Sequence, residues 1–140
     1  EYNISADVWS ATSYKQLRQD ALSVERWNML NPKKSPKKPY VTKLLENEIG
    51  PFIAVSDYMK LISDQISKWV PGGIRSLGTD GFGRSDTREA LRRHFEVDHG
   101  MIVVTVLYEL FLRKQIDIDL LNQAMNNFKI DSKKLNPLFI

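Results

Sequence analysis

The residues best suited to chemistry in this sequence lie in a glycine-rich segment, residues 77–86. Glycines at positions 78, 81 and 83 would let the backbone bend tightly and approach a partner closely. The segment lies between an expected strand and an expected helix, whose first N–H groups attract anions. Arg84 in the segment and Arg88 just after it could add charge-assisted hydrogen bonds. The pattern indicates an anion-binding or interface loop whose candidate residues are Gly81, Gly83, Arg84, Ser85 and Arg88.

Two features of the segment argue against phosphate binding. No lysine followed by serine or threonine comes after the last glycine, and the glycines occupy the first, fourth and sixth positions, whereas the dinucleotide pattern requires the first, third and sixth. Asp86, at the expected N-cap of the next helix, places its own carboxylate where an anion would bind. We therefore favour a structural turn, and keep a regulatory phosphate- or nucleotide-binding loop over residues 78–85 as the alternative.

Few other residues could act in catalysis. His94 and His99 are the only histidines, and His94 lies among arginines, which favours a surface or interface position over a general base. The sequence has no cysteine and no metalloprotease, nucleophile-elbow or calcium-loop pattern. We predict no catalytic, cofactor-binding or metal-binding residue in this chain. The arginines indicate a solvated or inter-subunit face and the tryptophans core packing: Arg84, Arg88, Arg92 and Arg93; Trp9, Trp27 and Trp69.

Strand and helix patterns alternate along the chain and would position this loop. Short segments rich in strand-forming residues lie at 7–12, 51–55 and 74–77. The second is an uninterrupted apolar run, typical of a strand buried on both faces of a parallel sheet. The alternation predicts one α/β domain over residues 1–140, with three layers and a mostly parallel sheet flanked by helices.

Helix signals fill the remainder of the chain. Ser13 and Gln16 form a capping box, and the helix they begin ends at Asn31-Pro32. A second helix is expected to carry an apolar face of Met59, Ile62, Ile66 and Trp69. Later helices are expected to begin at Asp86, with Glu89 at its third position, at Asp98, before a buried helix through 101–112, and at Asp117.

Composition limits the class of protein. The net charge is only +3, and four lysines fall in the proline-containing segment 33–39, which indicates a solvated loop. A polyanion-docking patch is the alternative there, but the segment lacks arginine and interleaved aromatics, so we expect no nucleic-acid partner. We also expect no membrane association, since no apolar run has the length of a membrane span and no signal peptide is visible. A cytoplasmic location is the expectation.

The block at 78–88, Gly-Thr-Asp-Gly-Phe-Gly-Arg-Ser-Asp-Thr-Arg, continues through residues 90–98 and resembles the segment typical of homodimeric, bacterial-type pyruvate dehydrogenase E1 components. Further resemblances follow in the same order along nearly the whole chain, at residues 25–28, 39–42, 56–59 and 127–137. The main departure is His99-Gly100, where the family more often has larger residues.

The resemblance implies a transketolase-like C-terminal α/β domain that mainly supports a homodimer and is inactive alone. Enzymes of this family decarboxylate pyruvate with thiamine diphosphate and Mg²⁺. They pass the two-carbon unit to a lipoyl group of the dihydrolipoyl acetyltransferase, in a complex that also contains dihydrolipoyl dehydrogenase. The resemblance also implies that the cofactor lies between two other domains, contributed by the two subunits.

The thiamine signature itself is only imitated in this chain. The family pattern is Gly-Asp-Gly followed by paired asparagines whose oxygens hold the metal. Residues 79–81, Thr-Asp-Gly, lack the first glycine, and the gap to Asn126-Asn127 is too long. The two asparagines also lie at the expected end of a helix, where asparagine is a common terminator. We therefore expect no cofactor on this chain.

Overall fold

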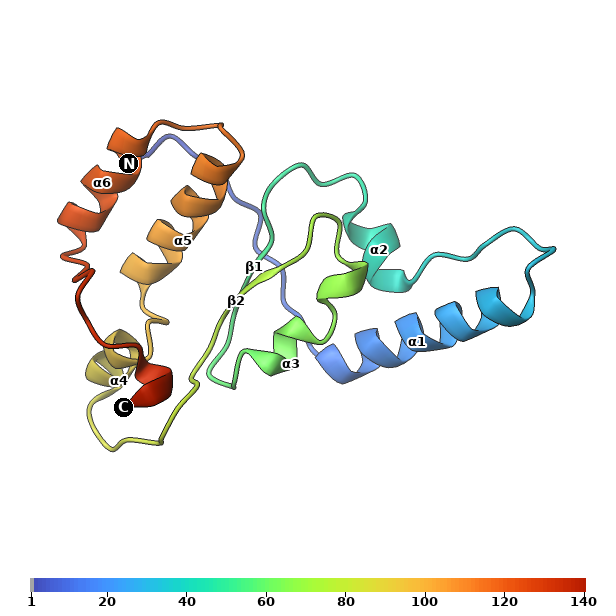
Figure 1. The fold of residues 1–140 in the computed structure, drawn as a ribbon, viewed down its shortest axis with the longest axis horizontal. Coiled ribbons are helices and arrows are strands. Elements are labelled where there is room, and N and C mark those ends of the chain that lie inside the picture. Colours follow the sequence, from blue (N-terminus) through green and yellow to red (C-terminus); the bar gives the residue numbers. More distant parts are fainter. Residues whose placement is uncertain (1) are drawn as a thin grey trace. The chain divides into compact units, whose positions relative to one another are not determined.

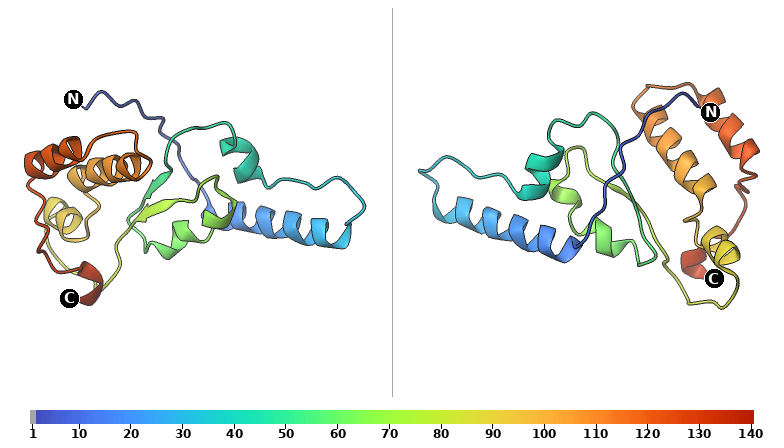
Figure 2. Two further views of the ribbon diagram at one scale, coloured as in Figure 1. Left: turned by 45° about the horizontal axis from the view of Figure 1, so that its top comes forward. Right: turned by 180° about the vertical axis from the view of Figure 1, so that it is seen from behind.

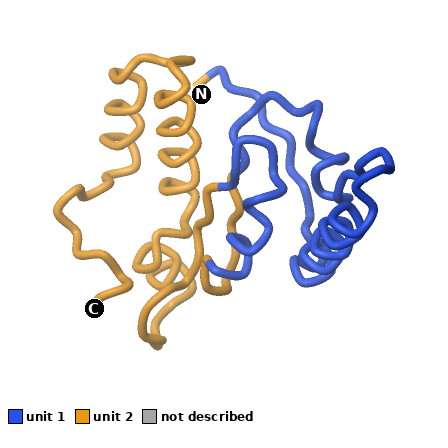
Figure 3. The backbone as a smooth tube through the Cα atoms, turned by 45° about the vertical axis from the view of Figure 1, so that its right-hand side comes forward, with its two compact units in different colours: residues 1, 3–52, 61–74 blue, residues 2, 53–60, 75–140 orange. Residues whose placement is uncertain are grey.

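A computed structural model describes residues 2–140, and the chain divides into two compact units. One unit comprises residues 3–52 and 61–74, and the other comprises residues 2, 53–60 and 75–140, as Figure 3 shows by colour. Each unit has its own hydrophobic core.

The first unit begins its regular structure with helix α1 (Tyr14–Leu30). The Ser13 hydroxyl accepts a hydrogen bond from the backbone N–H of Gln16 at 3.2 Å, so the predicted helix start is confirmed. Asn31 caps the other end, also as predicted. Ala21 is the one residue of α1 that is fully buried.

A short helix that the sequence patterns did not predict, α2 (Tyr40–Leu45), follows the lysine-proline loop. Asp20 accepts a hydrogen bond from the backbone N–H of Tyr40 at 2.7 Å, which satisfies one of the free donors at the start of α2. Val41 of α2 is buried against Ile66 and Val70 in the core of this unit. This helix depends on contacts distant in sequence, which explains why local patterns missed it.

The predicted strand at 7–12 does not form. The segment is extended but belongs to no sheet, and Val8 is 97% exposed. The prediction that Trp9 packs in a core is also wrong, since that side chain is 53% exposed. A strand requires a neighbouring strand as well as suitable residues, and no described segment pairs with this one.

The single helix expected over Met59 to Trp69 is also wrong. The structure has a short helix α3 (Leu61–Asp64) and a separate 3₁₀ turn η1 (Ser67–Trp69). The Trp69 indole donates to a carboxylate oxygen of Glu25 at 2.9 Å, and its carbonyl accepts from the Thr42 hydroxyl at 2.7 Å. These contacts hold Trp69 in the tighter 3₁₀ geometry that the periodicity did not indicate.

The second unit contains the sheet, formed by strands β1 (Ile53–Val55) and β2 (Arg75–Leu77). The two strands run parallel and pair Ile53 with Arg75 and Val55 with Leu77. Both were predicted, at slightly greater length. The prediction that the first of these strands is buried on both faces is wrong at Val55, which is 41% exposed.

Four helical elements complete the second unit: α4 (Arg88–His94), α5 (His99–Leu112), α6 (Ile118–Asn127) and the 3₁₀ turn η2 (Pro137–Phe139). Helices α5 and α6 lie side by side and antiparallel (Figures 1 and 2), and α5 also contacts β1. Val104, Leu107, Leu121 and Ala124 form the core between them. The predicted Asp98 cap is confirmed, because its carboxylate accepts from the Met101 N–H at 2.8 Å.

The small parallel sheet with accompanying helices confirms the α/β fold class. Within residues 2–140, every helix is too short or too polar to traverse a bilayer.

Candidate functional site

The glycine loop, residues 78–86, begins directly after β2 and is joined to the segment after β1. Gly78 is buried, and a Cβ there would lie 2.5 Å from the Tyr58 carbonyl oxygen and 2.8 Å from the Lys60 nitrogen. Thr79 donates its N–H to that same carbonyl at 3.0 Å and its hydroxyl to the Asp57 carbonyl at 2.8 Å. Glycine is therefore required at position 78 because two backbone segments meet there.

Asp80 continues this junction. Its carboxylate accepts from the Lys60 backbone N–H at 3.1 Å and lies 3.9 Å from the Lys60 ammonium. Asp80 was the carboxylate of the imitated metal motif, and its oxygens are instead used to hold the 57–60 segment.

Gly81 places the loop against the C-terminal turn. Its φ is +102°, and a Cβ there would lie 2.3 Å from the Pro137 carbonyl oxygen. A Cβ added at Gly83, by contrast, would meet nothing within 4 Å beyond its chain neighbours, so nothing around that position requires glycine. Phe82 between them is 80% exposed. Close packing against other backbone segments thus explains why glycine occupies positions 78 and 81.

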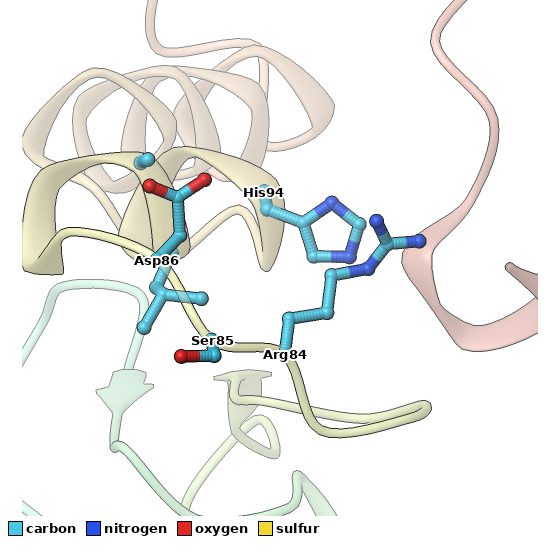
Figure 4. A pocket seen from close by; sticks show the side chains of 6 residues that line it. Arg84, Ser85, Asp86 and His94 are labelled. Carbon is cyan, nitrogen blue, oxygen red and sulfur yellow. The ribbon is translucent and has the colours of Figure 1, made fainter.

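A hollow of about 270 Å³ lies between the loop and α4. Figure 4 shows Arg84 extending toward the His94 ring, with Ser85 and Asp86 beside them. The residues that line the hollow are Arg84, Ser85, Asp86, Ala90, Leu91 and His94. Arg84 and Ser85 of the five predicted loop residues therefore come together here, whereas Gly81, Gly83 and Arg88 do not line the hollow.

His94 is one of the residues that line the hollow. Its Nε2 atom is inaccessible to solvent and has no hydrogen-bond partner among residues 2–140. Burial of the ring, and then the positive charges of Arg84 and Lys134, lower the pKa of His94 from its ordinary value, with Glu96 opposing the shift. The Phe95 ring packs edge-on against His94 at 4.8 Å between centroids. The surroundings therefore favour a neutral imidazole.

The start of α4 differs from the prediction by one residue. Thr87 is the N-cap, and its hydroxyl accepts from the Ala90 N–H at 3.3 Å. Asp86 precedes the cap and accepts from the Thr87 N–H at 2.7 Å. The prediction that Asp86 caps this helix is thus wrong, because Thr87 has the extended backbone that points its hydroxyl at the first turn. The Asp86 carboxylate still lines the hollow and would repel a second anion.

The end of α4 is held by Lys134, which the sequence patterns did not single out. Its ammonium donates to the carbonyls of Arg93 at 3.0 Å and His94 at 2.6 Å, and to the Glu96 carboxylate at 3.2 Å. Lysine commonly satisfies the last carbonyls of a helix. A residue so far along the chain gives no local signal of that role.

The predicted arginine face divides into different environments. Arg93 bonds to Asp98 at 2.9 Å and to the carbonyls of Phe128 and Lys129, so it is part of the packing. Arg92 forms only a long, exposed pair with Asp57 at 4.0 Å. Arg88 is exposed.

The hollow contains no serine or cysteine hydrogen-bonded to a base, since the orphaned His94 nitrogen has no donor in the described chain. No group of three or more acidic or histidine side chains within residues 2–140 could hold a metal ion. The Asp80 and Asn127 side chains do not fit a thiamine-metal site either, because Asp80 holds Lys60 and Asn127 donates to the Tyr2 hydroxyl at 3.2 Å.

Comparison with known proteins shows which proteins this chain is similar to. Residues 1–98 match the family model of the transketolase-like TK C-terminal domain. The chain is 48% identical over 139 residues to the pyruvate dehydrogenase E1 component of Pseudomonas aeruginosa, covering 99% of this chain and 16% of the relative. It is 46% identical over 138 residues to the Escherichia coli K12 E1 component and 44% identical over 137 residues to that of Mycobacterium tuberculosis, each covering 98% of this chain and 15% of the relative.

The chain thus spans about one sixth of the length of the curated relatives it matches. The likeness extends over nearly all of its residues, including the glycine loop and the helices after it. The segment that matches the family model includes both parallel strands and the turn that requires Gly78. The chain belongs to the family of transketolase-like C-terminal domains, and its matched relatives are pyruvate dehydrogenase E1 components.

Proposed function

We propose that residues 1–140 form the C-terminal α/β domain of a larger pyruvate dehydrogenase E1 enzyme. The observation that carries the proposal is the similarity to E1 components along 98–99% of the chain, although the chain spans only 15–16% of their length. In the proposed enzyme, pyruvate is decarboxylated and the acetyl unit is passed to the lipoyl group of a dihydrolipoyl acetyltransferase. A cytoplasmic location, and dihydrolipoyl dehydrogenase as the third component of the complex, belong to the same proposal.

Thiamine diphosphate and Mg²⁺ would be held by parts of the enzyme outside this chain. The donor groups described above support this division, because Asp80 is engaged by Lys60 and the hollow is lined with cationic and apolar groups as well as one carboxylate. The domain would contribute stability and subunit contacts. Its glycine loop and the start of α4, with Gly81, Gly83, Arg84, Ser85 and Arg88, would be part of an inter-subunit or inter-domain interface, with Phe82 exposed for the contact.

A chimera tests the enzyme assignment. The matched segment of the Pseudomonas aeruginosa E1 component is replaced by residues 2–140, and pyruvate decarboxylation and acetyl transfer are measured. Both activities should be retained. The matched control carries Gly81→Val, which forces a side chain into the Pro137 carbonyl and should abolish assembly. A folded, dimeric chimera without activity would contradict the proposal.

The isolated chain provides a second test. Mixed with thiamine diphosphate, Mg²⁺ and pyruvate, it should release no CO₂. Measurable turnover by this chain would show that it holds a complete active site, and would overturn the structural role.

The second candidate is a regulatory phosphate- or nucleotide-binding module. The hollow favours it to the extent that Arg84, Ser85 and His94 line it together. The Asp86 carboxylate in the same lining disfavours it. Calorimetric titration with phosphate and common nucleotides distinguishes the two roles, because a structural loop should give no binding heat at millimolar ligand.

A further inference from the structure

The end of α1 and the loop that follows it form a basic surface, here called the basic tip and defined as residues 27–39. Between Glu25 and Glu46 the sequence has no carboxylate and six cationic residues: Arg26, Lys33, Lys34, Lys37, Lys38 and Lys43. Lys38 forms an ion pair with Glu46. Within residues 2–140, the ammonium groups of Lys33, Lys34 and Lys37 have no carboxylate at ion-pair distance. These three ammonium groups therefore give the tip positive charge that no ion pair within residues 2–140 offsets.

This loop is held in one conformation by side-chain contacts. The Asn28 amide donates to the Lys37 carbonyl at 2.9 Å and accepts from the Lys37 N–H at 2.8 Å. The Asn31 amide donates to the Trp27 carbonyl at 2.9 Å, and Asp20 fixes the far end of the loop through the Tyr40 N–H. A partner would bind without the cost of ordering the loop backbone.

The apolar side chains of the tip differ in how much of their surface is covered. The Lys37 ammonium lies 3.9 Å from the centroid of the Trp27 ring, and the Lys34 ammonium lies 5.7 Å from it. The ring face is therefore covered by cations. In the same last turn of α1, Met29 and Leu30 are 71% and 55% exposed. The tip offers positive charge and uncovered aliphatic surface together.

We propose that the basic tip binds an acidic peptide segment that also carries apolar side chains, contributed by a partner protein. Carboxylates of the segment would relieve the mutual repulsion of Lys33 and Lys34, and its apolar side chains would cover Met29 and Leu30. Nucleic acid fits less well, because Trp27 is the one aromatic residue in the sequence of the tip and the Lys37 ammonium already lies over its ring, where a base would stack. The tip is formed by residues outside the glycine loop, so this proposal does not depend on the enzyme assignment.

The test measures binding of the 140-residue chain to a fluorescein-labelled peptide that repeats Glu-Glu-Leu, by fluorescence anisotropy. Lys33→Glu combined with Lys34→Glu should weaken binding about tenfold, as expected for close charge contacts. Lys114→Glu combined with Lys133→Glu makes the same change in net charge at exposed positions elsewhere, and should change affinity by less than about twofold. Met29→Gln combined with Leu30→Gln should also weaken binding, and circular dichroism checks that all variants fold.

The outcomes separate the alternatives. Loss of binding in both lysine pairs to the same extent would indicate attraction by net charge and would overturn the proposal. Tighter binding of a single-stranded oligonucleotide of equal charge would assign the tip to nucleic acid instead. Unchanged affinity in the Met29 and Leu30 variant would remove the apolar part of the recognition, and with it the proposal as stated.

Discussion

The guanidinium of Arg93 lies 2.9 Å from the Asp98 carboxylate, and that carboxylate also caps helix α5 through the Met101 N–H. The other side of the guanidinium donates to the Phe128 carbonyl at 2.9 Å, beyond the end of α6. One side chain therefore ties the end of α4 to the start of α5 and the end of α6.

Replacing Arg93 by methionine should destabilise the chain by about 1–3 kcal/mol, because the variant removes the donor to one Asp98 carboxylate oxygen and to the Phe128 carbonyl, while the Met101 N–H still donates to the other Asp98 oxygen. The expected loss is no larger because the Arg93 side chain is 41% exposed and water can reach part of the site. Urea denaturation monitored by circular dichroism measures the change. Arg88→Met is the matched control on the exposed side of α4 and should stay within about 0.5 kcal/mol. Equal effects of the two substitutions would show that the network contributes nothing.

Gly81→Ala should destabilise the chain by about 2 kcal/mol or more, since it combines a strained positive φ with a Cβ placed 2.3 Å from the Pro137 oxygen. Gly83→Ala removes a glycine from the same loop where nothing lies within 4 Å, and should be nearly neutral or slightly stabilising. Thermal unfolding of the two variants makes the comparison. A neutral Gly81→Ala would mean that the loop and the C-terminal turn do not meet in solution.

His94 should make stability depend on pH. Its folded-state pKa is lowered from the ordinary 6.5, so near and below that pH the unfolded chain binds a proton that the folded chain resists. Stability should therefore fall as the pH drops through about 6.5. His94→Gln should reduce this dependence, and His99→Gln should retain it. Urea midpoints measured across this range provide the check, and parallel curves for the chain and its His94 variant would contradict the shift.

Lys114 should be replaceable by glycine with a gain in stability. Helix α5 ends at Leu112, and two residues later Lys114 has φ +59° while the Gln115 N–H donates to the Leu110 carbonyl at 2.9 Å, the arrangement in which glycine is preferred. Lys114→Gly should add about 1 kcal/mol to the free energy of unfolding, because the left-handed conformation no longer strains a Cβ. Lys133→Gly, at a position without positive φ, should give no gain. Chemical denaturation decides between these expectations.

Features that depend on neighbours along the chain were predicted well. Ser13 and Asp98 cap the helices that their spacing to Gln16 and Met101 indicates, since a cap needs only a side chain three residues before a free N–H. Strands β1 and β2 lie within the segments predicted to be strands. The turn character of the glycine loop was also visible, because glycine spacing and a capped helix are local properties.

Features that depend on residues distant in the sequence were not predicted well. Residues 7–12 have strand-forming side chains but no strand beside them, and the expected helix before Trp69 breaks because Glu25 and Thr42 hold that residue in a tighter turn. Asp86 and Thr87 compete for the same cap, and only the backbone angles decide between them.

The amino-acid sequence by itself determined the family, through its resemblance to known members, the α/β class, and the starts of α1, α5 and α6, because these follow from motifs, periodicity and caps read within a few residues. Only the tertiary structure decided why the glycine loop needs two of its glycines. Gly78 meets the segment after β1, and Gly81 meets the Pro137 carbonyl far along the chain. It likewise placed Lys134 on the end of α4 and Arg84 beside His94. Such contacts are set by how the chain returns on itself, and the free volume around a backbone atom cannot be known until its distant neighbours are in place.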